Sequence, residues 1–171
     1  MTKSDFLAQV MPFKDKLFRL AKRLLVSTEE AQDATQEIVL KLWKSKDKMA
    51  SYKNVEAFAM TMTKNYCYDR LKSKQAQNLK IVHNNYKDES VALQKQIEVN
   101  DSLQWVAKIM NTLPEQQRLV VQFRDIEQYE FSEIAKILDM KETAVRVTLS
   151  RARKAIRTQL IKTHNYGVQH H

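Results

Sequence analysis

The chain of 171 residues contains only one glycine, two prolines and one cysteine. Glycine and proline supply much of the turn chemistry of β-hairpins, so their scarcity disfavours a β-rich fold. The sequence is instead rich in Leu, Lys, Ala, Gln and Glu, which favour helices. The single cysteine, Cys67, excludes an internal disulfide and fits a reducing compartment. We therefore expect an all-α protein.

The sequence also lacks a long apolar run, and it has fewer acidic than basic residues. No segment approaches the length of a membrane-spanning helix, and the first ten residues lack the apolar core of a signal peptide. The 29 Lys and Arg exceed the 20 Asp and Glu, which gives a net charge of +9. This excess implies an anionic partner, either nucleic acid or a membrane surface, and the lack of a spanning run makes the membrane the weaker choice. Without a phosphate loop, metal-ligand spacing or a catalytic constellation, we expect no enzyme activity, small-molecule substrate, cofactor or metal.

Residues 131–160 have the pattern of a helix-turn-helix. The first arm carries one apolar helical face, formed by Ile134, Ala135 and Leu138. Ser132 is placed to cap the amino end of this arm, and Asp139, which tolerates a left-handed backbone, begins the turn. The second arm has an apolar stripe at spacings of four, three, four and four residues, formed by Val145, Leu149, Ala152, Ile156 and Leu160.

Positive charge is concentrated in the second arm. Residues 141–171 hold seven Lys and Arg and one acid, whereas residues 101–140 hold four basic and seven acidic residues. The amino end of such a helix enters the major groove of DNA, and its basic flanks meet phosphates. The predicted DNA contacts are Lys141, Thr143, Arg146, Val147, Ser150, Arg151 and Lys154. Exposed Val147 suits a thymine methyl group. From this segment alone, a solvated basic face is the alternative.

The helix predicted for residues 29–46 has its acids in the first half and its lysines in the second, as the helix dipole prefers. Asp33, Glu37 and Lys41 stand four residues apart. On these residues alone, a ladder of ion pairs along one surface is the better interpretation.

The next predicted helix, residues 55–74, combines aromatic, amide and cationic side chains. Asn54 can cap its amino end, and Val55, Phe58, Ala59 and Met62 are expected to face the core. Rings stack on splayed bases, an amide reads a base edge and cations hold phosphates, so the mixture suits single-stranded nucleic acid. The candidates, with one ring from the preceding loop, are Tyr52, Lys64, Asn65, Tyr68, Arg70 and Lys72.

A flexible linker is predicted for residues 75–96, which are rich in Gln, Asn and Ser and have poor periodicity. It separates two small helical domains, residues 1–74 and 97–163. Residues 164–171, which end in two histidines, are expected to be a disordered tail or the remnant of a tag.

Three segments resemble motifs of the extracytoplasmic-function (ECF, group IV) sigma factors, members of the sigma-70 family that act with bacterial RNA polymerase. The segment EEAQDATQEIVLKLW (29–43) resembles the polymerase-binding helix of that family. The segment NVEAFAMTMTKNYCYDRLKSK (54–74) resembles its promoter-melting and minus-ten helix. Residues 113–156 resemble the domain that reads the minus-thirty-five element. The same order and spacing of all three motifs, across residues 6–162, make the resemblance very specific.

The resemblance implies a cytoplasmic, nucleoid-associated transcription initiation factor that contacts the clamp and flap of core RNA polymerase and binds promoter DNA. Its second domain would be the winged-helix-like sigma domain 4. The polymerase contacts would be Asp33, Gln36, Glu37 and Leu40, in place of the ion-pair ladder. An anti-sigma factor at the inner membrane is also implied. Three residues or segments depart from the family pattern: Asp139 replaces a common Gly, Phe58 a common Trp, and the linker is not acidic.

Two other functions remain open at this point. A helix-turn-helix repressor or response-regulator output protein, acting without polymerase, would explain residues 131–160 but not residues 52–74 or the acidic helix. A helical RNA-binding protein would instead bind single strands tightly without polymerase.

Overall fold

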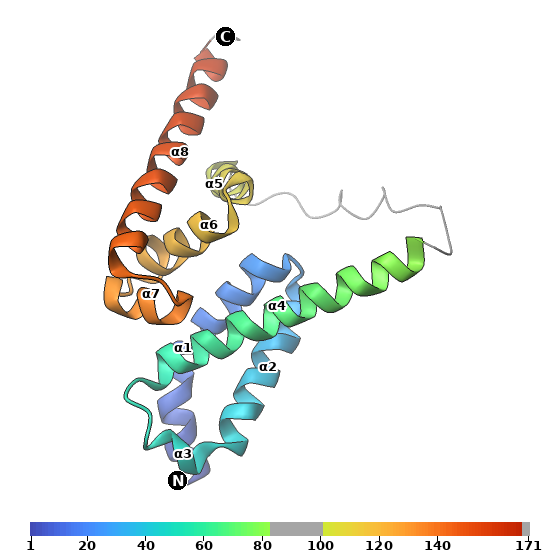
Figure 1. Ribbon diagram of the computed structural model, residues 1–171, viewed down its shortest axis with the longest axis vertical. Coiled ribbons are helices and arrows are strands. Elements are labelled where there is room, and N and C mark those ends of the chain that lie inside the picture. The colour runs from blue at the N-terminus through green and yellow to red at the C-terminus, as the bar shows by residue number, and fades with distance from the viewer. Residues whose placement is uncertain (83–100, 169–171) are drawn as a thin grey trace. The chain divides into compact units, whose positions relative to one another are not determined.

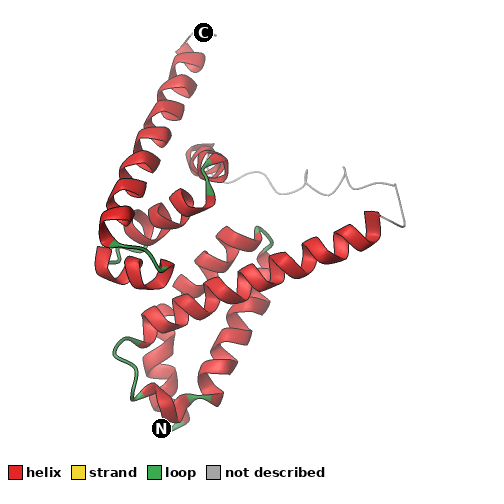
Figure 2. Cartoon of the chain, viewed as in Figure 1, coloured by secondary structure: helices red, strands yellow, loops and turns green. Residues whose placement is uncertain are grey.

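The computed structural model describes residues 1–82 and 101–168 (Figure 1). Every regular element in these residues is a helix, which confirms the predicted all-α fold (Figure 2). The chain forms two compact units, Met1–Lys87 and Asp88–His171. No described helix has both the length and the hydropathy needed to cross a bilayer.

The described residues of the first unit form four helices, α1 (Lys3–Leu25), α2 (Thr28–Lys44), α3 (Lys46–Met49) and α4 (Val55–Val82). In Figure 1, the long helix α4 crosses α1 and α2, and both of these helices contact it. Asn54 caps α4 as predicted, because its Oδ1 accepts from the N–H of Ala57 (2.9 Å). Ser27 caps α2 in the same way, with its Oγ accepting from the N–H of Glu30 (3.3 Å). Leu17, Leu20 and Ile38 fill the core between them.

The buried face of α4 differs from the predicted one. Its fully buried residues are Ala59, Met60, Thr63 and Cys67. Phe58, expected in the core, is 36% exposed. Three of these four side chains are small, and the buried Thr63 hydroxyl is satisfied by the carbonyl of Ala59 at 2.8 Å. The prediction for this face was therefore wrong by part of a helical turn.

The second unit contains α5 (Asp101–Thr112), α6 (Glu115–Val121), a π-helical turn η1 (Gln122–Ile126), α7 (Phe131–Leu138) and α8 (Glu142–Val168). Helices α7 and α8 confirm the helix-turn-helix, and Asp139 between them has φ 52°, in the left-handed region. Val145, Leu149 and Ala152 are buried as predicted. Leu160 is 43% exposed, and at this turn the preceding residue, Gln159, donates to Thr112 Oγ1 of α5 at 2.9 Å.

Three predictions about segment ends require correction. Glu130, and not Ser132, caps α7: it forms a capping box with Glu133, whose Oε2 accepts from the N–H of Glu130 at 3.0 Å. Helix α4 continues through residues 75–82, which were predicted to begin the linker. Helix α8 likewise continues through residues 164–168 of the predicted tail. The other linker residues, the predicted helical residues 97–100 and residues 169–171 lie outside the described residues.

Candidate nucleic-acid and polymerase interfaces

The exposed face of α8 carries most of the predicted upstream DNA contacts. Helical spacing puts Val147, Arg151 and Lys154 opposite the buried stripe of Val145 and Leu149. Thr143 and Ser150 lie beside them and are also exposed, and exposed Lys141 immediately precedes the helix. Val147 is 47% exposed among these polar side chains. The structure therefore brings this predicted set together on one solvent-facing surface.

The arginines of α8 differ in the contacts that their guanidinium groups make with the rest of the protein. The guanidinium carbon of Arg146 lies 4.1 Å from the centroid of the Phe131 ring. Arg153 donates to Asp125 through two N–H groups, and these hydrogen bonds raise the pKa of Arg153. Arg151, in contrast, forms no ion pair with any described residue. Arg146 and Arg153 are thus oriented within the protein, whereas Arg151 is available to a ligand.

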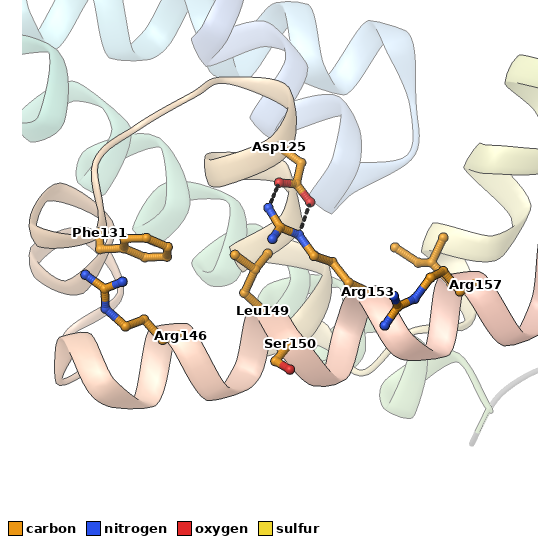
Figure 3. Close-up of a pocket in the computed structure, with 8 residues that line it drawn as sticks. Asp125, Phe131, Arg146, Leu149, Ser150, Arg153 and Arg157 are labelled. Atoms are coloured by element: carbon orange, nitrogen blue, oxygen red, sulfur yellow. Dashed lines mark hydrogen bonds and ion pairs between the residues drawn. The ribbon is translucent and has the colours of Figure 1, made fainter.

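An open cavity of about 600 Å³ lies along one flank of α8 (Figure 3). Its lining residues are Asp125, Phe131, Arg146, Leu149, Ser150, Arg153, Ile156 and Arg157. Of the charged and aromatic lining residues, Asp125, Phe131, Arg153 and Arg157 were absent from the predicted site. The spacing of seven residues from Arg146 to Arg153, and of four from Arg153 to Arg157, could have indicated this basic flank, because such residues share one side of a helix.

Tyr52 and Phe58 form an aromatic pair at the start of α4. Their rings are stacked, with centroids 4.3 Å apart and planes inclined at 28°. Asn65 and Lys72 follow Phe58 at intervals of seven residues, or about two turns, and both are exposed. The fully buried Cys67 lies on the opposite side of the helix. Rings, an amide and a cation therefore follow one exposed line along α4.

The other predicted residues of α4 are placed differently. Lys64 and Tyr68 are half-buried and flank the line of Asn65. Arg70 lies on the side that faces α2, where its Nη2 is 3.9 Å from Glu30 Oε1. Lys74 pairs with the same carboxylate oxygen. The structure thus separates Arg70 from the line of Tyr52 and Asn65.

The predicted polymerase contacts lie on α2. Asp33 and Gln36 are exposed, Leu40 is 44% exposed and Glu37 is half-buried. Of the ion-pair ladder, the Lys41 Nζ to Glu37 Oε1 pair is present, at 4.0 Å. Both partners of this pair are well solvated, so it contributes little to stability. These acidic and apolar groups remain available for a partner.

A groove of about 500 Å³ between α1 and α2, unforeseen in the sequence, extends this surface. Gln36 and Leu40 line it together with Lys3, Phe6, Leu7, Lys14, Val39 and Trp43. The rings of Phe6 and Trp43 meet edge to face, with centroids 5.1 Å apart. Within the described residues, no group of three His, Cys, Asp or Glu could hold a metal ion.

Each of the two units matches a model of a known protein family. The model of sigma-70 region 2 matches residues 10–77, and that of sigma-70 region 4 matches residues 103–156. The chain belongs to the sigma-70 family. As an ECF-type sigma factor, it is a transcription initiation factor that binds core RNA polymerase and directs it to promoters. This assignment confirms the predicted family, two-domain architecture and function, and it disfavours a repressor that acts without polymerase.

Individual relatives agree with this assignment. The chain is 24% identical to the ECF RNA polymerase sigma factor SigW of Bacillus subtilis (strain 168) in an alignment 163 residues long; the match covers 86% of this chain and 84% of SigW. The fold resembles the sigma factor RpoE of Bartonella quintana, solved with the anti-sigma factor NepR (TM-score 0.73, 21% identity, 91% of this chain and 96% of RpoE). It also resembles CnrH, solved with the cytosolic domain of CnrY (TM-score 0.68, 17% identity, 94% and 90%).

Proposed function

We propose that this sigma factor binds a promoter at two elements. At the downstream element, the exposed line on α4 separates the two DNA strands. The observation that carries the proposal is the alignment of Asn65 with the Tyr52–Phe58 stack and with Lys72. The rings would stack on a base extruded from the non-template strand, and the Asn65 amide would read its edge. Lys72 and the flanking Lys64 and Tyr68 would hold the neighbouring backbone. Arg70, next to Glu30, would contribute through long-range charge.

The upstream element binds the exposed face of α8. The amino end of this helix would enter the major groove at the minus-thirty-five element, with Thr143, Arg146 and Val147 near the bases. Lys141, Ser150, Arg151 and Lys154 would then meet phosphates on either side. The high positive charge of residues 141–171 supports this assignment.

The polymerase would bind on α2. Asp33, Gln36 and Glu37 would supply polar contacts to the clamp, and Leu40 with the adjoining groove would supply apolar area. The second unit would meet the flap while it holds the upstream element. We keep the predicted domains, residues 1–74 and 97–163, and assign the end of α4 to the first domain.

An anti-sigma factor is the further partner that we propose. Both fold neighbours above were solved in complexes, one with a protein named as an anti-sigma factor and one with a cytosolic domain. Such a partner would hold this chain in the cytoplasm, close to the inner membrane when its own anchor lies there. The exposed apolar groups of the α1–α2 groove would suit a competing protein surface.

Transcription by holoenzyme reconstituted from the full chain and core polymerase tests the proposal. Sequencing the transcripts made on genomic DNA should reveal two shared upstream elements. Asn65→Ala should relax base preference in the downstream element alone, and Arg151→Gln should weaken binding at the upstream one. Gel filtration with and without core polymerase separates this function from that of a repressor acting alone, and single-strand binding by the free chain separates it from that of an RNA-binding protein. Tight binding of free single strands by the chain alone would support that rival and contradict our proposal.

A further inference from the structure

The ring of Phe131 contacts two arginines from different elements. Phe131 is the first residue of α7 and is half-buried. The guanidinium carbon of Arg146, on α8, lies 4.1 Å from the ring centroid, and that of Arg124, in η1, lies 4.3 Å from it. Figure 3 shows the guanidinium of Arg146 directed toward this ring, at the edge of the cavity beside α8. One aromatic ring is thus contacted by two cations.

Arg124 is fixed in turn by its own surroundings. Its Nη1 donates to the carbonyl oxygen of Tyr129 at 2.8 Å and lies 3.7 Å from Glu130 Oε2. The negative charge of Glu130 offsets the repulsion between the two guanidinium groups, which share one ring. Arg124 and the start of α7 therefore hold the ring in place, and Arg146 rests against a fixed surface.

A stacked arginine is prepared for binding in a way that a solvated one is not. The side chain of arginine has many rotamers, and immobilising it on binding costs conformational entropy. A guanidinium held against an aromatic ring has already lost much of that freedom, while its N–H groups still point outward in the plane of the guanidinium. Arg151, on the same helix, has no such ring among the described residues. The two exposed arginines therefore start from different states.

We infer that Phe131 is a positioning residue, which holds Arg146 in the orientation needed to read one guanine of the upstream element. Arg146 lies in the first turns of α8, the part of a recognition helix that reaches base edges. An arginine donates in pairs to O6 and N7 of guanine, and this geometry tolerates little rotation. The inference rests on the proposed role of α8 in binding the minus-thirty-five element.

The test compares variants of the full chain in holoenzyme. Affinity is measured for a promoter set in which each upstream base pair is replaced in turn, at several salt concentrations. Phe131→Leu, which keeps apolar volume but removes the ring face, should weaken cognate binding about two- to fivefold. The loss should be confined to the base pair that Arg146→Gln no longer discriminates. The salt slope should stay unchanged, because no phosphate contact is removed.

Three further variants separate positioning from structure. Phe131→Tyr retains the ring and should bind like the wild type. Arg146→Lys retains the charge but cannot stack flat, so it should lose preference at the same base pair as Phe131→Leu. The double variant of Phe131→Leu and Arg146→Gln should bind no worse than Arg146→Gln alone. Thermal unfolding of each variant identifies any loss of fold, and Arg146→Lys supplies the test if Phe131→Leu unfolds.

The results that would overturn the inference differ from those that would overturn the proposed function. A uniform loss across all promoter positions, or additive effects in the double variant, would mean that Phe131 only supports the fold. An unchanged preference profile in both Phe131→Leu and Arg146→Lys would also overturn the inference. If Arg146→Gln and Arg151→Gln both leave upstream binding unaltered, the role of α8 itself is wrong. Position-specific loss in Arg146→Gln without any in Phe131→Leu would reject only the positioning role.

Discussion

Arg153 donates two hydrogen bonds to Asp125, from Nη2 to Oδ1 at 2.5 Å and from Nε to Oδ2 at 3.2 Å. This pair joins α8 to η1 across 28 residues of sequence. Because Arg153 is already engaged, its positive charge is partly neutralised before any DNA arrives. Arg151, two residues earlier, has no ion-pair partner among the described residues. Arg153 therefore makes a contact within the protein, whereas Arg151 remains available to DNA.

Replacing Arg153 should affect the stability of the protein, whereas replacing Arg151 should affect its affinity for DNA. Arg153→Gln should lower the free energy of unfolding by about 1 kcal/mol or less, because the lost pair is largely exposed. Arg151→Gln should leave stability within about 0.5 kcal/mol of the wild type, as is usual for unpartnered surface positions. Arg151→Gln should also weaken promoter binding. The slope of the logarithm of affinity against the logarithm of salt concentration should become shallower by about one unit. Denaturant titration and salt-dependent DNA binding measure the two effects, and equal behaviour of both variants would contradict the distinction.

This pair illustrates what the sequence could and could not predict in the second unit. The helix-turn-helix was predictable because the apolar stripe from Val145 to Ala152 has one consistent helical period, and Asp139 suits the left-handed turn. The partners of Arg146 and Arg153 were not, because Phe131 and Asp125 reach them only through tertiary packing. Local periodicity locates the face of a helix, but it says little about which cation on that face is engaged.

The first unit shows a different limit. Residues 57–63 are all apolar or threonine, so several faces of α4 fit an apolar pattern equally well. Close approach of small side chains decided the register: Ala59, Thr63 and Cys67 are completely buried. Phe58 then points outward, where the ring of Tyr52 covers it. The larger apolar residue was the natural choice for the core, and helix packing overrode that preference.

Reversing the charge of Asp33 and Glu37 should abolish holoenzyme formation. Both acids lie on the outer surface of α2, where repulsion from the polymerase surface would replace attraction. The fold should survive, because the Glu37–Lys41 pair is weak. Co-purification with core polymerase measures the interaction, and circular dichroism verifies the helices. Reversal of two exposed acids elsewhere, Asp47 and Glu115, is the matched control. Retention of core binding by the Asp33 and Glu37 variant would refute the assignment.

Tyr52→Ala should impair promoter opening more than promoter binding. The variant removes one ring of the stack that we expect to receive the extruded base, and base stacking on an aromatic ring is worth about 1–3 kcal/mol. Permanganate reactivity of unpaired thymines should therefore fall on duplex DNA. A template with an unpaired downstream element should restore most of the activity, because strand separation is already complete. Ser73→Ala, at an exposed position of α4 outside the proposed site, is the control and should open duplex normally. If the unpaired template gives no rescue, the ring acts elsewhere.

Val147→Ser should relax preference at one upstream base pair. Val147 is the apolar residue at the centre of the exposed face of α8, where its methyl groups suit a thymine methyl. Loss of one such contact should cost about 1 kcal/mol or less, a fewfold change in affinity at that pair. Binding to promoters with thymine replaced by uracil, which lacks the methyl group, supplies the comparison. The variant and the wild type should bind the uracil promoter alike. An unchanged preference profile in the variant would count against the contact.

The stability of the first unit should fall in alkaline solution through Cys67. Burial raises the pKa of this thiol from 9.0 to about 12. The folded protein thus holds the proton more tightly than the unfolded chain does. The resulting stabilisation is complete below pH 9 and is lost as the pH rises toward 12, by about 1.4 kcal/mol per pH unit.

The measurement is the difference in the free energy of unfolding between the wild type and Cys67→Ala, followed from pH 8 upward. Alanine has no ionisable group, so all other titrations cancel in this difference. The advantage of the wild type, which comes from the packed sulfur, should shrink steadily above pH 9. Thiol reagents should also react with Cys67 only as fast as the first unit opens, because the side chain is fully buried. A pH-independent difference, or rapid labelling of the native protein, would show that the thiol is solvated and that α4 does not press Cys67 against α1 and α2.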